Sequence, residues 1–156
     1  MGMTLWQIMK NVDFGRQERA EYVKIIGLKT GTSKRTGMFK AISKAYSRKQ
    51  GAPKSYRYAC SVTQIDDKSH VHVSCSCPDF MYRWEYRLWA RGASEIYYCN
   101  GEAPVTNAKA ACCKHLVMTF KALFEKGFLN GDLTFKVKPA KLAWPNNSPS
   151  VPKFRS

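Results

Sequence analysis

The segments that decide the fold are CSCPDF at residues 75–80 and CKHL at residues 113–116. Each segment carries two metal-binding side chains that are separated by one residue. The four candidate ligands are Cys75, Cys77, Cys113 and His115. Three thiols and one imidazole are a ligand set used by tetrahedral structural zinc sites. The sequence therefore predicts one Zn²⁺ ion held by these four residues.

The spacing of the ligands has a backbone explanation. Residues i and i+2 of a strand point to the same side, so Cys75 and Cys77 can reach one ion where a strand ends. In a regular helix they would face nearly opposite ways, so Cys113 and His115 can share an ion only if a helix begins between them. Apolar residues at helical spacing continue from there and favour such a helix: Leu116, Phe120, Leu123 and Phe124.

The C-x-C…C-x-H order, with a hairpin before it and a helix after it, resembles the SWIM-type zinc finger, and CPDF and CKHL match that family's local pattern. The resemblance covers about the middle third of the chain, with Cys75, Cys77, Cys113 and His115 as the matching ligands. It implies a zinc-binding ββα module that contacts nucleic acid or protein and does not imply catalysis. Residues 78–112 separate the two halves by more than is expected for the family, which implies an insertion.

A β-hairpin is predicted to carry the first two ligands. Residues 56–65 alternate, residues 66–69 form a turn, and the chain then returns along a second strand that reaches Cys77. A four-residue turn places Cys60 opposite Cys75. Val62 then lies opposite Val73. His70 and His72 fall on the face away from the ligands. They are therefore predicted to be exposed strand residues rather than zinc ligands.

Three further cysteines leave alternatives open. Beside Cys75, Cys60 could replace a ligand or form a cross-strand disulfide, although a buried free thiol is the favoured interpretation. Cys99 is spare, and it too could replace a ligand. Either Cys112 or Cys113 could be the third ligand, and Cys113 is preferred because only it makes the C-x-H spacing.

The charge predicts an anionic partner. The chain has 26 Lys and Arg residues against 11 Asp and Glu residues, a formal net charge of +15. Nucleic acid is the commonest partner of so basic a protein, and a solvated basic surface is the alternative. The residues predicted to contact nucleic acid are Lys34, Arg35, Lys40, Lys44, Arg48, Arg83, Arg87 and Arg91.

Three segments supply these cations. A Gly- and Thr-rich loop at residues 29–37 offers backbone N–H groups and charge to phosphates, or is simply solvated. A helix is predicted over residues 38–48, with its cations four residues apart and no acid to offset them, although a core helix with a solvated back fits equally. A second helix, predicted from Pro78 to Gly92, interleaves arginines with aromatics, as nucleic-acid and protein interfaces both do. One apolar stripe of this helix is predicted to be Phe80, Trp84 and Leu88, with Met81 as an open further member.

The predicted fold class is α+β, with a small β-hairpin/ββα core, additional helices and an extended C-terminal arm. The predicted regions are a basic helical N-terminal region (1–50), a zinc-finger core with a helical insertion (51–138) and a Pro-rich basic arm (139–156). Within them, residues 3–10 form a helical turn, residues 23–28 fit a strand or a helix, and the last helix ends at Gly127. A short strand is predicted at residues 133–137.

The function expected from these features is that of a non-enzymatic zinc protein. Four ligands close the metal site, and no hydrolytic zinc or nucleophile motif occurs. The expected partners are nucleic acid or neighbouring subunits, without a membrane or a small-molecule substrate. Clustered cysteines indicate a cytosolic location. The alternative is a structural component of a nucleic-acid-containing assembly such as a phage or virus particle, with zinc serving stability alone and the virion as the location.

Overall fold

The computed structural model describes residues 2–30, 38–46, 55–66, 68–97, 99, 101 and 109–136. Four strands form one antiparallel sheet in the order β1 (Lys24–Thr30), β2 (Met38–Tyr46), β3 (Ser55–Gln64) and β4 (Val71–Cys75). The helical elements are α1 (Leu5–Lys10), α2 (Phe14–Ala20), the π-helical η1 (Phe80–Trp84), α3 (Glu85–Ala90) and α4 (Lys114–Glu125). The described residues thus form an α+β fold, as predicted.

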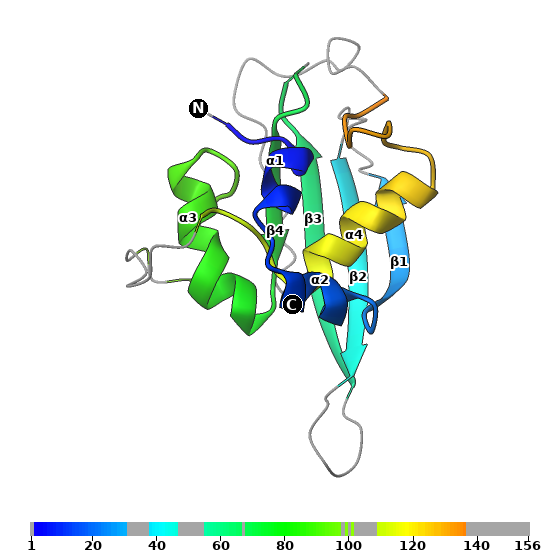
Figure 1. Cartoon of the computed structure of the whole chain (residues 1–156). Coiled ribbons are helices and arrows are strands. Elements are labelled where there is room, and N and C mark those ends of the chain that lie inside the picture. The colour runs from blue at the N-terminus through cyan, green and yellow to red at the C-terminus, as the bar shows by residue number, and fades with distance from the viewer. Residues whose placement is uncertain are drawn as a thin grey trace.

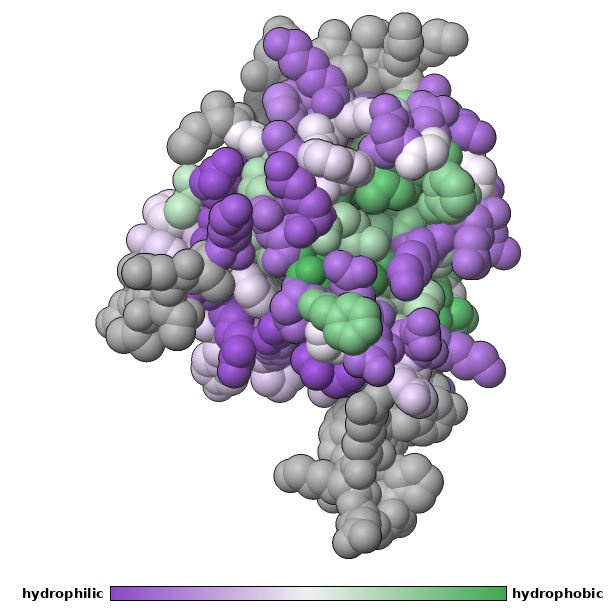
Figure 2. All heavy atoms as spheres, in the orientation of Figure 1, coloured by the Kyte–Doolittle hydropathy of each residue, from purple (hydrophilic) through white to green (hydrophobic). Residues whose placement is uncertain are grey.

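The helices are arranged unevenly about the sheet. Helix α4 crosses one face and contacts all four strands, while α1 and α2 lie on the same side and α3 lies beside the β4 edge (Figure 1). Buried residues from the sheet and α4 form the core between them, including Val62, Val73, Leu116 and Phe120. Figure 2 shows hydrophilic side chains over most of this helical side, interrupted by hydrophobic patches.

The predicted hairpin is confirmed in its register. Cys60 pairs with Cys75, and Val62 pairs with Val73. The Ile65 N–H donates to the His70 carbonyl at 2.9 Å, which closes the four-residue turn. Because side chains alternate between the faces of a strand, this register sends Cys75 to the buried face that α4 covers.

The predicted helix over residues 38–48 is wrong, because residues 38–46 form strand β2. Phe39, Ala41 and Ser43 are buried, while Ile42 is 43% exposed, which is the two-residue period of a half-buried strand. Cations at positions 40 and 44 match either structure, because a spacing of four keeps them on one face of a strand as well as of a helix. Residue 48 lies outside the described residues.

The other helical predictions are confirmed with one refinement. The segment after Pro78 divides into π-helical η1 and α-helical α3, and its stripe of Phe80, Trp84 and Leu88 is buried. Helices α3 and α4 each end close to a glycine in the left-handed region, with φ of 74° at Gly92 after α3 and 85° at Gly127 after α4. Glycine adopts this conformation without a Cβ clash and so terminates a helix readily.

The N-terminal residues complete the sheet. Helix α1 begins at Leu5 within the predicted segment 3–10, and its N-cap Thr4 makes a capping box with Gln7. The ambiguous run at residues 23–28 belongs to strand β1 from Lys24 onward. The region predicted as N-terminal and helical therefore contributes β1 and β2 to the sheet that also holds the hairpin. In place of the short strand predicted at residues 133–137, the described residues show an isolated bridge between Leu129 and Phe135. The predicted arm at residues 139–156 lies outside the described part of the chain.

Candidate metal centre

The end of β4 positions the first two ligands. Cys75 is the last residue of the strand, and the following turn is tied to β3 by two hydrogen bonds. The Ser76 N–H donates to the Ala59 carbonyl at 3.0 Å, and the Ala59 N–H donates to Ser76 Oγ at 2.9 Å. Cys77 follows directly and is 1% exposed. The hairpin thus holds both sulfurs at one buried corner of the sheet.

The start of α4 positions the other two ligands. Cys113 is the N-cap residue, with extended backbone (φ −80°, ψ 167°), and His115 lies in the first helical turn. The helix therefore begins between the two ligands, as the C-x-H spacing predicted. The buried stripe of α4, which includes Leu116, Phe120 and Leu123, packs this first turn against the sheet.

The four predicted ligands meet. One donor atom each from Cys75, Cys77, Cys113 and His115 lies within 4.8 Å of the other three, and all four residues are buried. In a tetrahedral site with Zn–S bonds of ~2.3 Å, neighbouring sulfurs lie roughly 3.8 Å apart. The cluster is therefore close to the size of one metal coordination shell, and it can hold a metal ion.

The chemistry of the donors also fits a metal. His115 is 3% exposed, and neither ring nitrogen has a hydrogen-bond partner within the described part of the chain. Leaving such a group unpaired costs about 1–3 kcal/mol, which a bond to a metal would remove. The Phe80 N–H donates to Cys77 Sγ at 3.3 Å, an interaction that stabilises negative charge on the sulfur.

The three thiols of the cluster differ in the direction of their pKa shifts. Hydrogen bonds from Cys113 and Cys75 lower the pKa of Cys77 far below its usual range. Burial raises the pKa of Cys75 and of Cys113. A bound metal requires all three sulfurs to be thiolates, so its binding would release protons.

The remaining cysteines lie outside the cluster. Cys60 is a buried free thiol whose Sγ lies 3.6 Å from Cys75 Sγ, as the favoured interpretation had it. Cys112 is buried and Cys99 is half-buried, and both are free. The cluster includes Cys113 and not Cys112, which agrees with the preference for Cys113.

The two strand histidines also lie outside the cluster, as predicted, but both are half-buried rather than exposed. His70 Nδ1 contacts Asp66 Oδ2 at 2.5 Å. Burial lowers the pKa of His72, against the opposing charge of Glu95.

A partly buried ion pair, which sequence reasoning missed, holds the turn after Cys77 against α2. Arg16 of α2 donates twice to the Asp79 carboxylate, at 2.7 Å from Nε and 2.6 Å from Nη2, and its Nη1 contacts Asp13 at 2.6 Å. The guanidinium also lies over the Trp84 ring, 5.0 Å from its centre. Asp79, the N-cap residue of η1, therefore links the turn after Cys77 to α2.

The predicted nucleic-acid-binding residues separate into three groups. Residues Lys34, Arg35 and Arg48 lie outside the described residues. On η1 and α3, Arg83 is 65% exposed, Arg87 lies over the Trp84 ring, and Arg91 is exposed at the helix end. The third group, Lys40 and Lys44, belongs to strand β2.

The sheet register places these two lysines among other cations. Lys40 pairs with Lys29 of β1, and Lys44 pairs with Lys24 of β1 on one side and with Arg57 of β3 on the other. Cross-strand partners share a face of the sheet, so the register assigns these five positions to one face in two rows. We call this set, Lys24, Lys29, Lys40, Lys44 and Arg57, the basic sheet face. Sequence reasoning missed three of its members because it treated residues 38–48 as a helix.

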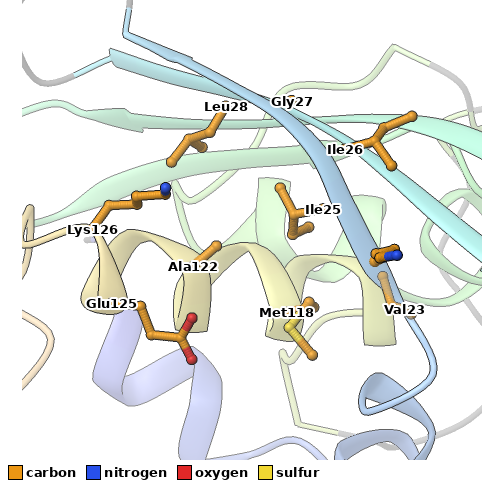
Figure 3. Close-up of a pocket in the computed structure, with 10 residues that line it drawn as sticks. Val23, Ile25, Ile26, Gly27, Leu28, Met118, Ala122, Glu125 and Lys126 are labelled. Carbon is orange, nitrogen blue, oxygen red and sulfur yellow. The ribbon is translucent and has the colours of Figure 1, made fainter.

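The structure also has a groove of about 470 Å³ between β1 and α4, shown in Figure 3. Its lining mixes apolar and polar surface, with Ile25, Leu28 and Met118 facing the space and Glu125 and Lys126 at one end. Histidine, cysteine and hydroxyl side chains are absent from the described residues that line it. The chemistry-bearing side chains gather instead at the metal cluster.

Comparison with known proteins yields no assignment. A scan against protein-family models found no match, and searches of curated proteins and of solved structures found no significant match. Among the helices of the described ranges, none combines the length and apolar character that crossing a membrane requires.

Proposed function

We propose that the chain is a non-enzymatic zinc protein that contacts nucleic acid through its basic surface. The observation that carries the proposal is the basic sheet face, in a chain whose formal net charge is +15. The zinc would draw the hairpin and α4 together, and the sheet so stabilised would present its cations to phosphates. We further propose that the metal core is a SWIM-like module with residues 78–112 as its insertion.

The donor set supports zinc as the metal. Three thiolates and an imidazole suit tetrahedral Zn²⁺ better than the oxygen-preferring Mg²⁺ or Ca²⁺. Four protein ligands would leave no open position for water or substrate, which is the arrangement of a structural site and supports the absence of catalysis. All four ligands are buried where the end of β4 meets the start of α4, so the ion would contribute directly to the free energy of folding.

The pairing of like charges supports an anionic partner. Cations directly opposite one another on a sheet destabilise it by an amount comparable to the ~0.2–1 kcal/mol of a favourable pair. The basic sheet face contains three such pairs, and strands β1, β2 and β3 contain no Asp or Glu to relieve them. A polyanion across the rows would convert this repulsion into attraction. Nucleic acid, with a phosphate at every nucleotide, matches repeated cations better than a single small anion does.

A salt titration of binding tests the proposal. Zinc-loaded protein is titrated with labelled single-stranded and duplex oligonucleotides at several salt concentrations, and the logarithm of affinity should fall linearly with the logarithm of salt. Lys44→Gln and Arg57→Gln should each weaken binding and reduce the slope by about one. Lys121→Gln, on α4, is the matched control and should change neither. Negligible affinity of the wild type for both nucleic acids at low salt would overturn the proposal.

A second candidate function is that of a structural subunit in a nucleic-acid-containing assembly such as a phage or virus particle. It is favoured by exposed aromatic side chains, since Phe14 is 78% exposed and Tyr82 is 74% exposed. Aromatics at the surface are typical of protein interfaces. Sedimentation of the zinc-loaded protein with and without nucleic acid tests it. Concentration-dependent assembly that Phe14→Ser abolishes would support this function, and a monomer under both conditions would refute it.

A further inference from the structure

A basic hollow of about 370 Å³ lies beside the metal cluster, where α2, the turn after Cys77 and the start of α4 meet. Its lining consists of Arg16, Arg19, Asp79, Arg83, Lys114 and His115. Four cations thus surround a single carboxylate. We call this site the basic hollow; it lies on the helical side of the sheet, away from the basic sheet face.

Two cations of the basic hollow have no carboxylate partner among the described residues. Arg16 is held by Asp79 and Asp13, and Arg83 Nε lies 3.6 Å from Asp79. In contrast, Arg19 and Lys114 form no ion pair with a described residue. The hollow therefore holds positive charge that the described carboxylates do not neutralise.

The start of α4 adds to this positive charge. No acidic residue lies in its first turn, and the Cys113 side chain makes no capping hydrogen bond. The first N–H groups of the twelve-residue helix therefore lack the partner that a capping side chain supplies. Together with the helix dipole they favour an anion at this end.

His115 gives an independent indication of a ligand. It lines the hollow, it is 3% exposed, and both of its ring nitrogens are unpartnered among the described residues. One nitrogen belongs to the metal cluster. A metal-bound imidazole normally donates its other N–H to an oxygen acceptor, and the described residues supply none. An oxyanion in the hollow would be such an acceptor.

We propose that the basic hollow binds a phosphate group, positioned by Arg19, Lys114 and the first N–H groups of α4. For phosphates of a nucleic-acid backbone, this inference rests on the proposed function; for free phosphate it does not. The competing explanation is that the cations only offset the metal centre, since Zn²⁺ with three thiolates and a neutral imidazole carries a net charge of −1. The two explanations differ in whether an anion binds to the loaded protein.

The first test uses inorganic phosphate and the full-length, zinc-loaded protein. Titration followed by ¹⁵N NMR should shift the backbone amides of residues 114–116 saturably in the wild type. Arg19→Gln and Lys114→Gln should each weaken phosphate binding about tenfold, the loss expected for one charged hydrogen bond, while one zinc per chain is retained. Lys121→Gln is the control and should leave the affinity unchanged. The absence of a saturable shift, or variants that lose zinc without any change in phosphate affinity, would overturn the proposal.

The second test uses an oligonucleotide and separates the two phosphate sources. If the hollow seats a backbone phosphate, each variant should lower the salt slope of oligonucleotide binding by about one. Phosphate binding without any oligonucleotide binding by the wild type would support the hollow as a free-phosphate site and refute the proposed function. Oligonucleotide binding whose slope is unchanged in both variants would refute the nucleic-acid form of the inference.

Discussion

Two adjacent cysteines provide a matched test of the metal site. Cys112 and Cys113 are both fully buried, but only Cys113 belongs to the four-ligand cluster. We predict that Cys113→Ala abolishes stoichiometric zinc binding and cooperative folding, whereas Cys112→Ala retains one zinc per chain and the native fold. Both substitutions remove one sulfur atom from an interior position, so the difference between them isolates metal ligation from packing.

The expected magnitudes differ widely. For Cys112, loss of one buried heavy atom is comparable to an Ile→Val change, about 0.5–1.5 kcal/mol. For Cys113, the variant loses a ligand from a site of the kind whose apparent binding free energy is about 10–16 kcal/mol in zinc-finger peptides. The net stability of a domain is only about 5–15 kcal/mol. Losing a substantial part of the zinc contribution therefore unfolds the chain.

Zinc content and thermal unfolding of reduced, purified proteins measure both quantities. Atomic emission should give one zinc per chain for the wild type and Cys112→Ala, and a small fraction of that for Cys113→Ala. Circular dichroism should show a cooperative transition for the first two proteins alone. The reasoning is refuted if Cys113→Ala retains one zinc with a wild-type melting temperature, or if both variants lose zinc equally.

Four further predictions test the surroundings of the site. Asp79→Asn removes the carboxylate charge that joins Arg16 to the turn after Cys77 and leaves Asp13 as the only carboxylate on Arg16 among the described residues. We expect a loss of about 1.5–3 kcal/mol, seen as a melting temperature several degrees lower; an unchanged temperature would contradict it. Cys60→Ala should retain one zinc per chain, and a variant that no longer binds zinc would show that Cys60 is a ligand. Phe120→Ala, at a fully buried position of α4, should lower the free energy of unfolding by about 3–5 kcal/mol in urea. Burial lowers the pKa of His72, so protonation favours the unfolded state and stability should fall as the pH drops below about 6.5; His72→Gln should flatten this fall in zinc-saturated protein, and an identical pH profile would contradict it.

The ligands and the hairpin register could be predicted because they depend on local periodicity. Side chains alternate strictly along a strand, so one turn length was enough to pair Cys60 with Cys75. Likewise, the one-residue spacing of Cys113 and His115 required a helix to begin between them, and α4 begins there. These predictions needed no knowledge of the rest of the chain.

The helix predicted over residues 38–48 failed because its strongest signal was ambiguous. Lysines four residues apart share a face in a helix and in a strand, and the segment contains no Gly or Pro that would distinguish the two structures. Strand β2 is specified by its neighbours β1 and β3, which pair with it on both sides. The basic sheet face depends on this pairing, so it could not be predicted without the register.

The basic hollow was inaccessible to sequence reasoning for a similar reason. Arg16 and Asp79 are 63 positions apart, and no local pattern connects them. Their ion pair exists because α2 packs against α4 next to the metal-binding turn. Long-range contacts of this kind follow from tertiary packing, which periodicity does not describe.

X-ray absorption spectroscopy at the zinc edge tests the central claim most directly, that a single ion joins the hairpin to the start of α4. For the reduced wild-type protein we predict three sulfur neighbours at about 2.3 Å and one nitrogen neighbour at about 2.0–2.1 Å. A coordination shell containing oxygen ligands, a shell of four sulfurs, or protein that contains no zinc would contradict this account.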